Sequence, residues 1–130
     1  MTSESAKDQL PEIDREFLDK KGFDYEVTKV GGELHLVIRD FDFPAYAPSK
    51  ANLLIIIPAG YPNAQLDMFW TNPDVKLPNG AWPAQCQHHQ EHSGKSWQRW
   101  SRHFQQAWRS GIDGLRTFMA SIRAEISKGI

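Results

Sequence analysis

One cysteine and three nearby histidines are the residues of this sequence best suited to covalent chemistry. Cys86 is the only cysteine, and His88, His89 and His92 follow it within six residues. A thiol reacts as its thiolate, and a neighbouring cationic group lowers the thiol pKa. A histidine close to a thiol can also deprotonate an incoming amine. The segment therefore predicts an acyl-carrying nucleophile, and the alternative is that Cys86 is a small buried apolar residue.

The same segment contains soft and borderline ligands that zinc prefers. The spacing of Cys86 and the histidines matches no standard zinc motif, so we expect neither a metal nor another cofactor. Arginines and tryptophans interleave over residues 97–109, a mixture that stacks on nucleobases in some proteins and packs in the core of others. The formal net charge of -1 favours core packing, and we expect no nucleic-acid partner.

These residues need a scaffold, and the hydrophobic pattern predicts one. Apolar residues recur at helical spacing once, then alternate or run together in four short segments separated by turn residues. The pattern predicts a helix over residues 11–21 and strands over residues 25–30, 34–38, 52–57 and 66–70. Because four predicted strands follow one another with turns and loops between them, we expect a four-stranded antiparallel meander preceded by one helix.

A long loop follows the predicted meander and contains the cysteine. Residues 71–93 lack regular periodicity and include three prolines. Loops of this length are uncommon in compact domains and are usually functional. Beyond the loop, Trp97, Trp100 and Phe104 recur at helical spacing, and an apolar stripe from Ile112 to Ile126 predicts an amphipathic C-terminal helix.

The length of 130 residues fits one domain. We expect residues 9–130 to form a single α+β domain behind a flexible stretch at residues 1–8. The start of the sequence is polar and acidic, and the lone cysteine forms no internal disulfide, so we expect a cytoplasmic location. The longest apolar run, residues 53–57, is far shorter than the roughly 20 residues that span a bilayer.

Several short segments resemble ubiquitin-conjugating (E2) domains. Residues 54–62 look like the third strand and the Tyr-Pro turn of that superfamily, and residues 68–70 look like the end of its fourth strand. Gly80, Cys86 and Trp97 then follow in the superfamily's order. A closer resemblance is to the bacterial branch called prokaryotic E2 family E, carried by the run Trp97-Gln98-Arg99-Trp100-Ser101-Arg102-His103. The resemblance covers residues 14–126.

The resemblance implies a fold and a function. The fold would be UBC-like, with an N-terminal helix, a four-stranded antiparallel meander, a long active-site loop and C-terminal helices. The protein would accept a ubiquitin-like modifier from an E1/ThiF-type activating enzyme as a thioester on Cys86 and pass it to an acceptor. A JAB-type peptidase would act in the same pathway. The alternative is a catalytically inactive UBC-like binding module that docks the modifier or the activating enzyme.

The resemblance also implies roles for residues around the cysteine. Asn79 or Asp74 occupies the place of the asparagine that supports the oxyanion, although Asn79-Gly80 is also typical of a simple tight turn. From the chemistry of the side chains alone, His88, His89, His92 or Asp74 could act as the base. The residues expected to organise the loop are Trp97, Arg99, Trp100, Arg102 and His103, and His103 has a purely structural role as its alternative.

Overall fold

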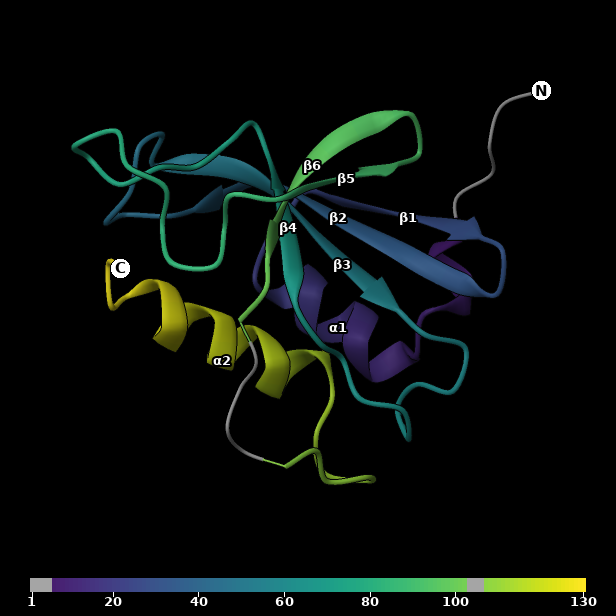
Figure 1. The fold of residues 1–130 in the computed structure, drawn as a ribbon. Helices are drawn as coiled ribbons and strands as arrows, with labels where there is room; N and C mark the ends of the chain where they lie inside the picture. The colour runs from purple at the N-terminus through teal and green to yellow at the C-terminus, as the bar shows by residue number, and fades with distance from the viewer. Residues whose placement is uncertain (1–5, 103–106) are drawn as a thin grey trace.

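A six-stranded antiparallel sheet with both helices on one of its faces forms the fold (Figure 1). The computed structural model describes residues 6–102 and 107–130. In chain order the elements are η1 (Lys7–Gln9), α1 (Glu12–Lys20), β1 (Tyr25–Val30), β2 (Glu33–Asp42), β3 (Lys50–Ile57), β4 (Phe69–Asn72), β5 (His89–His92), β6 (Lys95–Trp100) and α2 (Leu115–Ile126). The strand order across the sheet is β1-β2-β3-β4-β6-β5.

The α+β class and the first half of the element order are confirmed. Helix α1 falls inside the predicted range, and β1 and β2 form the predicted hairpin, with Val30 opposite Glu33. Strands β1 to β4 are neighbours in sequence order, as the predicted meander requires. Two further strands, β5 and β6, extend the sheet beyond β4, so the prediction of four strands was incomplete.

The tryptophans that suggested a helix lie in strand β6 instead. Trp97 packs with Leu54 and Trp70 on the outer face of the sheet, whereas Trp100 lies in the main core beneath the helices. Residues three apart in a strand point to opposite faces. Because β6 lies between β4 and β5 and is covered on both faces, it carries large apolar residues at a spacing that mimics a helix. Phe104 lies outside the described residues.

The two ends of the chain differ in detail from the prediction. Ala6 is buried, and its N–H donates to the Val27 carbonyl at 2.8 Å, so the packed structure begins before residue 9. Residues 1–5 lie outside the described part. At the other end the described residues contain one helix after the loop, α2, and Ile112 precedes it with 63% of its surface exposed. Among the described helices, none has the length and apolar character to span a membrane.

Tyr61 joins the two helices at the start of α2. Its hydroxyl donates to the Asp14 carboxylate of α1 at 2.7 Å and accepts from the Leu115 N–H at 2.7 Å. The first N–H groups of a helix have no intrahelical partner, so this hydroxyl caps α2. Burial raises the pKa of the Asp14 carboxyl above its ordinary value. The hydrogen bond from Tyr61 acts in the opposite direction but has the smaller effect.

We expect Tyr61→Phe to lower the free energy of unfolding by about 1–2 kcal/mol, because the change removes the cap of α2 and one of the donors to the buried Asp14 carboxylate. Urea denaturation measures this change. Tyr25→Phe is the matched control, since the Tyr25 hydroxyl bonds only the exposed side of α1 through Asp19. Equal losses in the two variants would show that the Tyr61 hydroxyl does not cap α2.

Candidate functional site

The loop between β4 and β5 spans residues 73–88 and is tied to the sheet at several points. Ala47 and Lys76 exchange two backbone hydrogen bonds of 2.8 Å each. Near the other end, the Arg99 N–H donates to the His88 carbonyl at 2.8 Å, and the Ser101 N–H donates to the Gln85 carbonyl at 3.0 Å. The last residues of the predicted loop form β5 instead. The loop is therefore an anchored segment, held to the end of β6 and to the connection between β2 and β3.

Gln98 holds the interior of this loop. Its side chain is fully buried; the amide oxygen accepts from the Thr71 hydroxyl at 2.8 Å and from the Val75 N–H at 2.6 Å. The amide nitrogen donates to the Val75 carbonyl at 2.8 Å and to the Cys86 carbonyl at 3.2 Å. This role of Gln98 was not predicted from the sequence. One feature of the sequence could have indicated it: Gln98 is a polar residue two positions before Trp100, and it therefore shares the inner face of a buried strand with that tryptophan.

Cys86 is enclosed at the inner side of the loop. Its side chain is 0% exposed, lies in the main hydrophobic core and donates from Sγ to the Ala84 carbonyl at 3.1 Å. Burial raises the pKa of the thiol to about 12, and the Arg102 guanidinium beside it opposes this rise with a smaller effect. The thiol is therefore neutral at physiological pH in this conformation.

Arg102 connects the cysteine loop to the end of α2. Its Nε donates to the Ala84 carbonyl at 3.0 Å, the same oxygen that accepts from Cys86. Its guanidinium lies 4.8 Å from the centre of the Trp100 ring, 3.6 Å from the Glu125 carboxylate, and also donates to the Ile130 carbonyl. A buried guanidinium with this many partners fixes the loop and α2 relative to each other.

Asp74 and His89 form a polar pair on the exposed side of the loop. The Asp74 Oδ1 atom lies 2.9 Å from His89 Nε2. The Trp82 ring meets the imidazole edge-on at 5.7 Å between ring centres, and the Lys76 ammonium lies 4.6 Å above the same indole. The structure thus brings together two of the residues predicted to act as a base, whereas the Cys86 thiol contacts Ala84 and Arg102 instead.

Asn79 and His88 have simpler surroundings. The Asn79 side-chain oxygen accepts from the Ala81 N–H at 2.9 Å, and the Gly80 N–H donates to the Leu77 carbonyl at 2.8 Å. Gly80 has φ of 86°, which favours glycine. This is the tight turn considered as the alternative for Asn79-Gly80. His88 is exposed and contributes its backbone carbonyl to the pairing with Arg99.

The remaining residues of the tryptophan-rich run lie in or next to β6. Trp100 stacks on Phe69 at 5.1 Å between ring centres, and its indole N–H donates to the Thr71 hydroxyl at 2.9 Å. The Trp97 indole donates to the His92 carbonyl at 3.2 Å, and Arg99 donates from Nε to the Ser101 hydroxyl at 2.7 Å. The tryptophan contacts hold β6 against β4 on one side and β5 on the other. His103 lies outside the described residues.

The family model for prokaryotic E2 family E matches residues 10–129 of this sequence. The chain belongs to prokaryotic E2 family E. The match spans both helices, all six strands and the cysteine loop, so the resemblance based on the tryptophan-rich run is confirmed. No curated protein matches the chain, and no solved structure matches it.

In this family E protein the described residues provide no ready metal site. Across residues 6–102 and 107–130, no three histidine, cysteine, aspartate or glutamate side chains lie close enough together to hold a metal ion. Two of the three histidines that follow Cys86 lie in separate places. His89 pairs with Asp74 beside the loop, and His92 packs on Trp70 at the outer face of the sheet.

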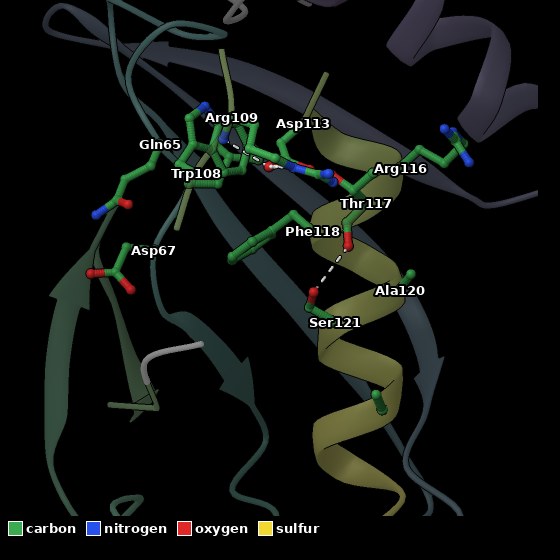
Figure 2. A pocket seen from close by; sticks show the side chains of 12 residues that line it. Gln65, Asp67, Trp108, Arg109, Asp113, Arg116, Thr117, Phe118, Ala120 and Ser121 are labelled. Atoms are coloured by element: carbon green, nitrogen blue, oxygen red, sulfur yellow. Dashed lines mark hydrogen bonds and ion pairs between the residues drawn. The ribbon is translucent and has the colours of Figure 1, made fainter. Parts of the chain in front are cut away.

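A separate hollow of about 450 Å³ lies against α2 (Figure 2). Arg109 and Asp113 meet at its edge, where the Arg109 N–H donates to Asp113 at 2.8 Å and the guanidinium donates at 3.2 Å. Bonding to Arg109 holds the pKa of Asp113 below its ordinary value. None of the described residues predicted for the site lines this hollow, so we do not assign it a role in E2-like chemistry.

We expect Asp74→Asn to change the free energy of unfolding by less than about 1 kcal/mol, because both members of the Asp74–His89 pair are substantially exposed. Chemical denaturation measures this effect. A loss above about 2 kcal/mol would show instead that the pair is a structural anchor of the loop.

Proposed function

We propose that this family E protein is an E2-like docking module that binds a ubiquitin-like modifier or its E1/ThiF-type activating enzyme, with Cys86 serving as a core residue. The observation that carries the proposal is the complete burial of the Cys86 side chain together with a thiol pKa raised to about 12. A nucleophilic cysteine needs the opposite surroundings, which are electropositive and partly exposed.

The state of the thiol argues against thioester formation in this conformation. Transfer of a modifier to Cys86 requires a thiolate that reaches the modifier's terminal carbonyl. A thiol with a pKa of about 12 is ionised in roughly one molecule in 10⁵ at neutral pH.

The proposal includes a UBC-like arrangement of the elements. Helix α1 precedes strands β1 to β4, which are neighbours in sequence order; the long cysteine loop and α2 follow (Figure 1). This order supports a UBC-like domain in which β5 and β6 form an additional hairpin. The docking proposal rests on this scaffold together with the placement of the cysteine in its core.

One observation favours a second candidate function, in which Cys86 carries the modifier after the loop opens. The Arg102 guanidinium lies beside the thiol and acts to lower its pKa. Opening of the loop would remove the effect of burial, which is the larger of the two, and retain the cationic neighbour if Arg102 follows. This route requires the bond between Arg102 and the Ala84 carbonyl to break or move with the loop.

Calorimetric titration with a ubiquitin-like modifier and a ThiF-type activating enzyme from the same genome tests the docking proposal. We expect one of them to bind wild type and Cys86→Ala with dissociation constants within about threefold, since a core cysteine makes no contact with a partner. Circular dichroism checks that the variant is folded. Binding of neither protein to the folded wild type would overturn the proposal.

A further inference from the structure

Two indoles hold the hairpin of β5 and β6, one from the neighbouring strand β4 and one from within the hairpin. The Trp70 indole N–H donates to the Gln90 side-chain oxygen at 2.9 Å, and the Trp97 indole N–H donates to the His92 carbonyl at 3.2 Å. Both tryptophans belong to the small apolar cluster on that face. The position of the hairpin therefore decides whether this cluster is covered.

Two histidines meet where the end of the hairpin reaches the sheet. His92 of β5 and His35 of β2 lie 5.6 Å apart between ring centres, and His92 meets the Trp70 ring at 5.3 Å. His35 is only 6% exposed. Within residues 6–102 and 107–130, His92 Nε2 is buried without a hydrogen-bond partner. The contact is thus an apolar packing of two imidazoles.

Burial favours the neutral imidazoles, and the charged groups around this contact do not reverse that preference. Glu33 of β2 is the acid that acts on both histidines, and Lys95 of β6 lines the same hollow of about 270 Å³. Glu26 of β1 also lines the hollow, but Arg39 donates to it at 3.0 Å and neutralises its charge. Burial lowers the pKa of His35 and of His92, and for His35 the charge of His92 lowers it further. Glu33 opposes this shift at both histidines without reversing it.

We propose that the His35–His92 contact is a pH-sensitive latch that releases the end of the β5–β6 hairpin when either imidazole takes up a proton. A charged imidazole in this hollow loses hydration and faces a second imidazole, whereas in the released hairpin it is hydrated. Release uncovers Trp70 and Trp97. This inference is independent of the proposed docking function.

The pH range follows from the direction of the shifts. The folded pKa of each histidine lies below the ordinary value of 6.5, so the folded state binds fewer protons than the released state. The contact is fully stabilising above pH 6.5, and its contribution is lost as the pH falls through the lowered values. Each unit by which a pKa is lowered corresponds to about a tenfold rise in the released population on acidification.

NMR titration of the whole chain from about pH 8 to about pH 5 tests the latch. The ring C–H signals follow each histidine, and the indole N–H signals of Trp70 and Trp97 follow the two bonds of the hairpin. We expect His35 and His92 to titrate below pH 6.5 and both indole signals to move with the same midpoint.

His35→Gln removes one imidazole and is expected to raise the midpoint of His92, whereas His88→Gln removes an exposed histidine of the same segment and is expected to leave it unchanged. The wild-type titration is informative even if His35→Gln does not fold. Indole signals that stay still while both histidines titrate would overturn the proposal. So would a His92 midpoint at or above 6.5 in the wild type.

Discussion

Replacing Gln98 by leucine is expected to lower the free energy of unfolding by about 3–4 kcal/mol and to loosen the cysteine loop. The side chain satisfies the Thr71 hydroxyl, both backbone groups of Val75 and the Cys86 carbonyl. Leucine has a similar volume but bonds none of them. Because these groups are buried, each is left without the partner that compensates its loss of water, which is why the expected cost exceeds that of one hydrogen bond.

Urea denaturation of Gln98→Leu against Gln90→Leu measures this effect. Gln90 lies in the neighbouring strand, is only partly buried and accepts one bond, from Trp70, so its replacement is expected to cost less than about 1 kcal/mol. The Gln98 variant is also expected to expose Cys86 to thiol reagents. Equal free energies of unfolding for the two variants would show that the four buried bonds of Gln98 do not stabilise the loop as expected.

The Cys86 thiol is expected to react with a disulfide reagent at pH 7.5 about a thousandfold more slowly than in the urea-unfolded chain. The ordinary pKa of 9.0 is raised to about 12 in the fold, and this difference of about three units changes the thiolate fraction by about that factor. Burial slows access of the reagent further. Because the folded pKa is raised, the contribution of the neutral thiol to stability is fully present below pH 9.0 and is lost as the pH rises toward about 12.

Stopped-flow or manual mixing with the reagent, with the unfolded chain as the reference, checks this rate. The lone cysteine makes the signal unambiguous. A folded-state rate within about tenfold of the unfolded rate would mean that the loop opens readily, and it would favour the second candidate function over the docking module.

The sequence predicts the elements whose pattern is local. α1 has apolar residues at helical spacing, and the hairpin of β1 and β2 has alternation around Gly31-Gly32, so periodicity alone places them. β6 could not be predicted in this way, because burial on both faces removes alternation and gives Trp97 and Trp100 a helix-like spacing. The pairing of β6 with β4 is a contact between distant segments that no local pattern contains.

The candidate site shows the same division between local and long-range effects. The turn at Asn79-Gly80 could be anticipated, because the dipeptide itself favours it. The position of Cys86 could not, since its polar neighbours Gln85 and Gln87 are exposed as a loop residue would be, while the cysteine between them points into the core. Its inward position accompanies the bond from Gln98 to the Cys86 carbonyl, a partner twelve residues away.

A charging assay tests most directly whether this chain is a docking module or carries the modifier on Cys86. The chain is mixed with ATP, a ThiF-type activating enzyme and a ubiquitin-like modifier from the same genome, and products of wild type and Cys86→Ala are resolved without reductant. A thioester on the activating enzyme itself shows that activated modifier is present. The docking account predicts no thiol-sensitive adduct on this chain in either form. An adduct that forms on wild type and is absent from Cys86→Ala would contradict it and identify Cys86 as an acyl carrier.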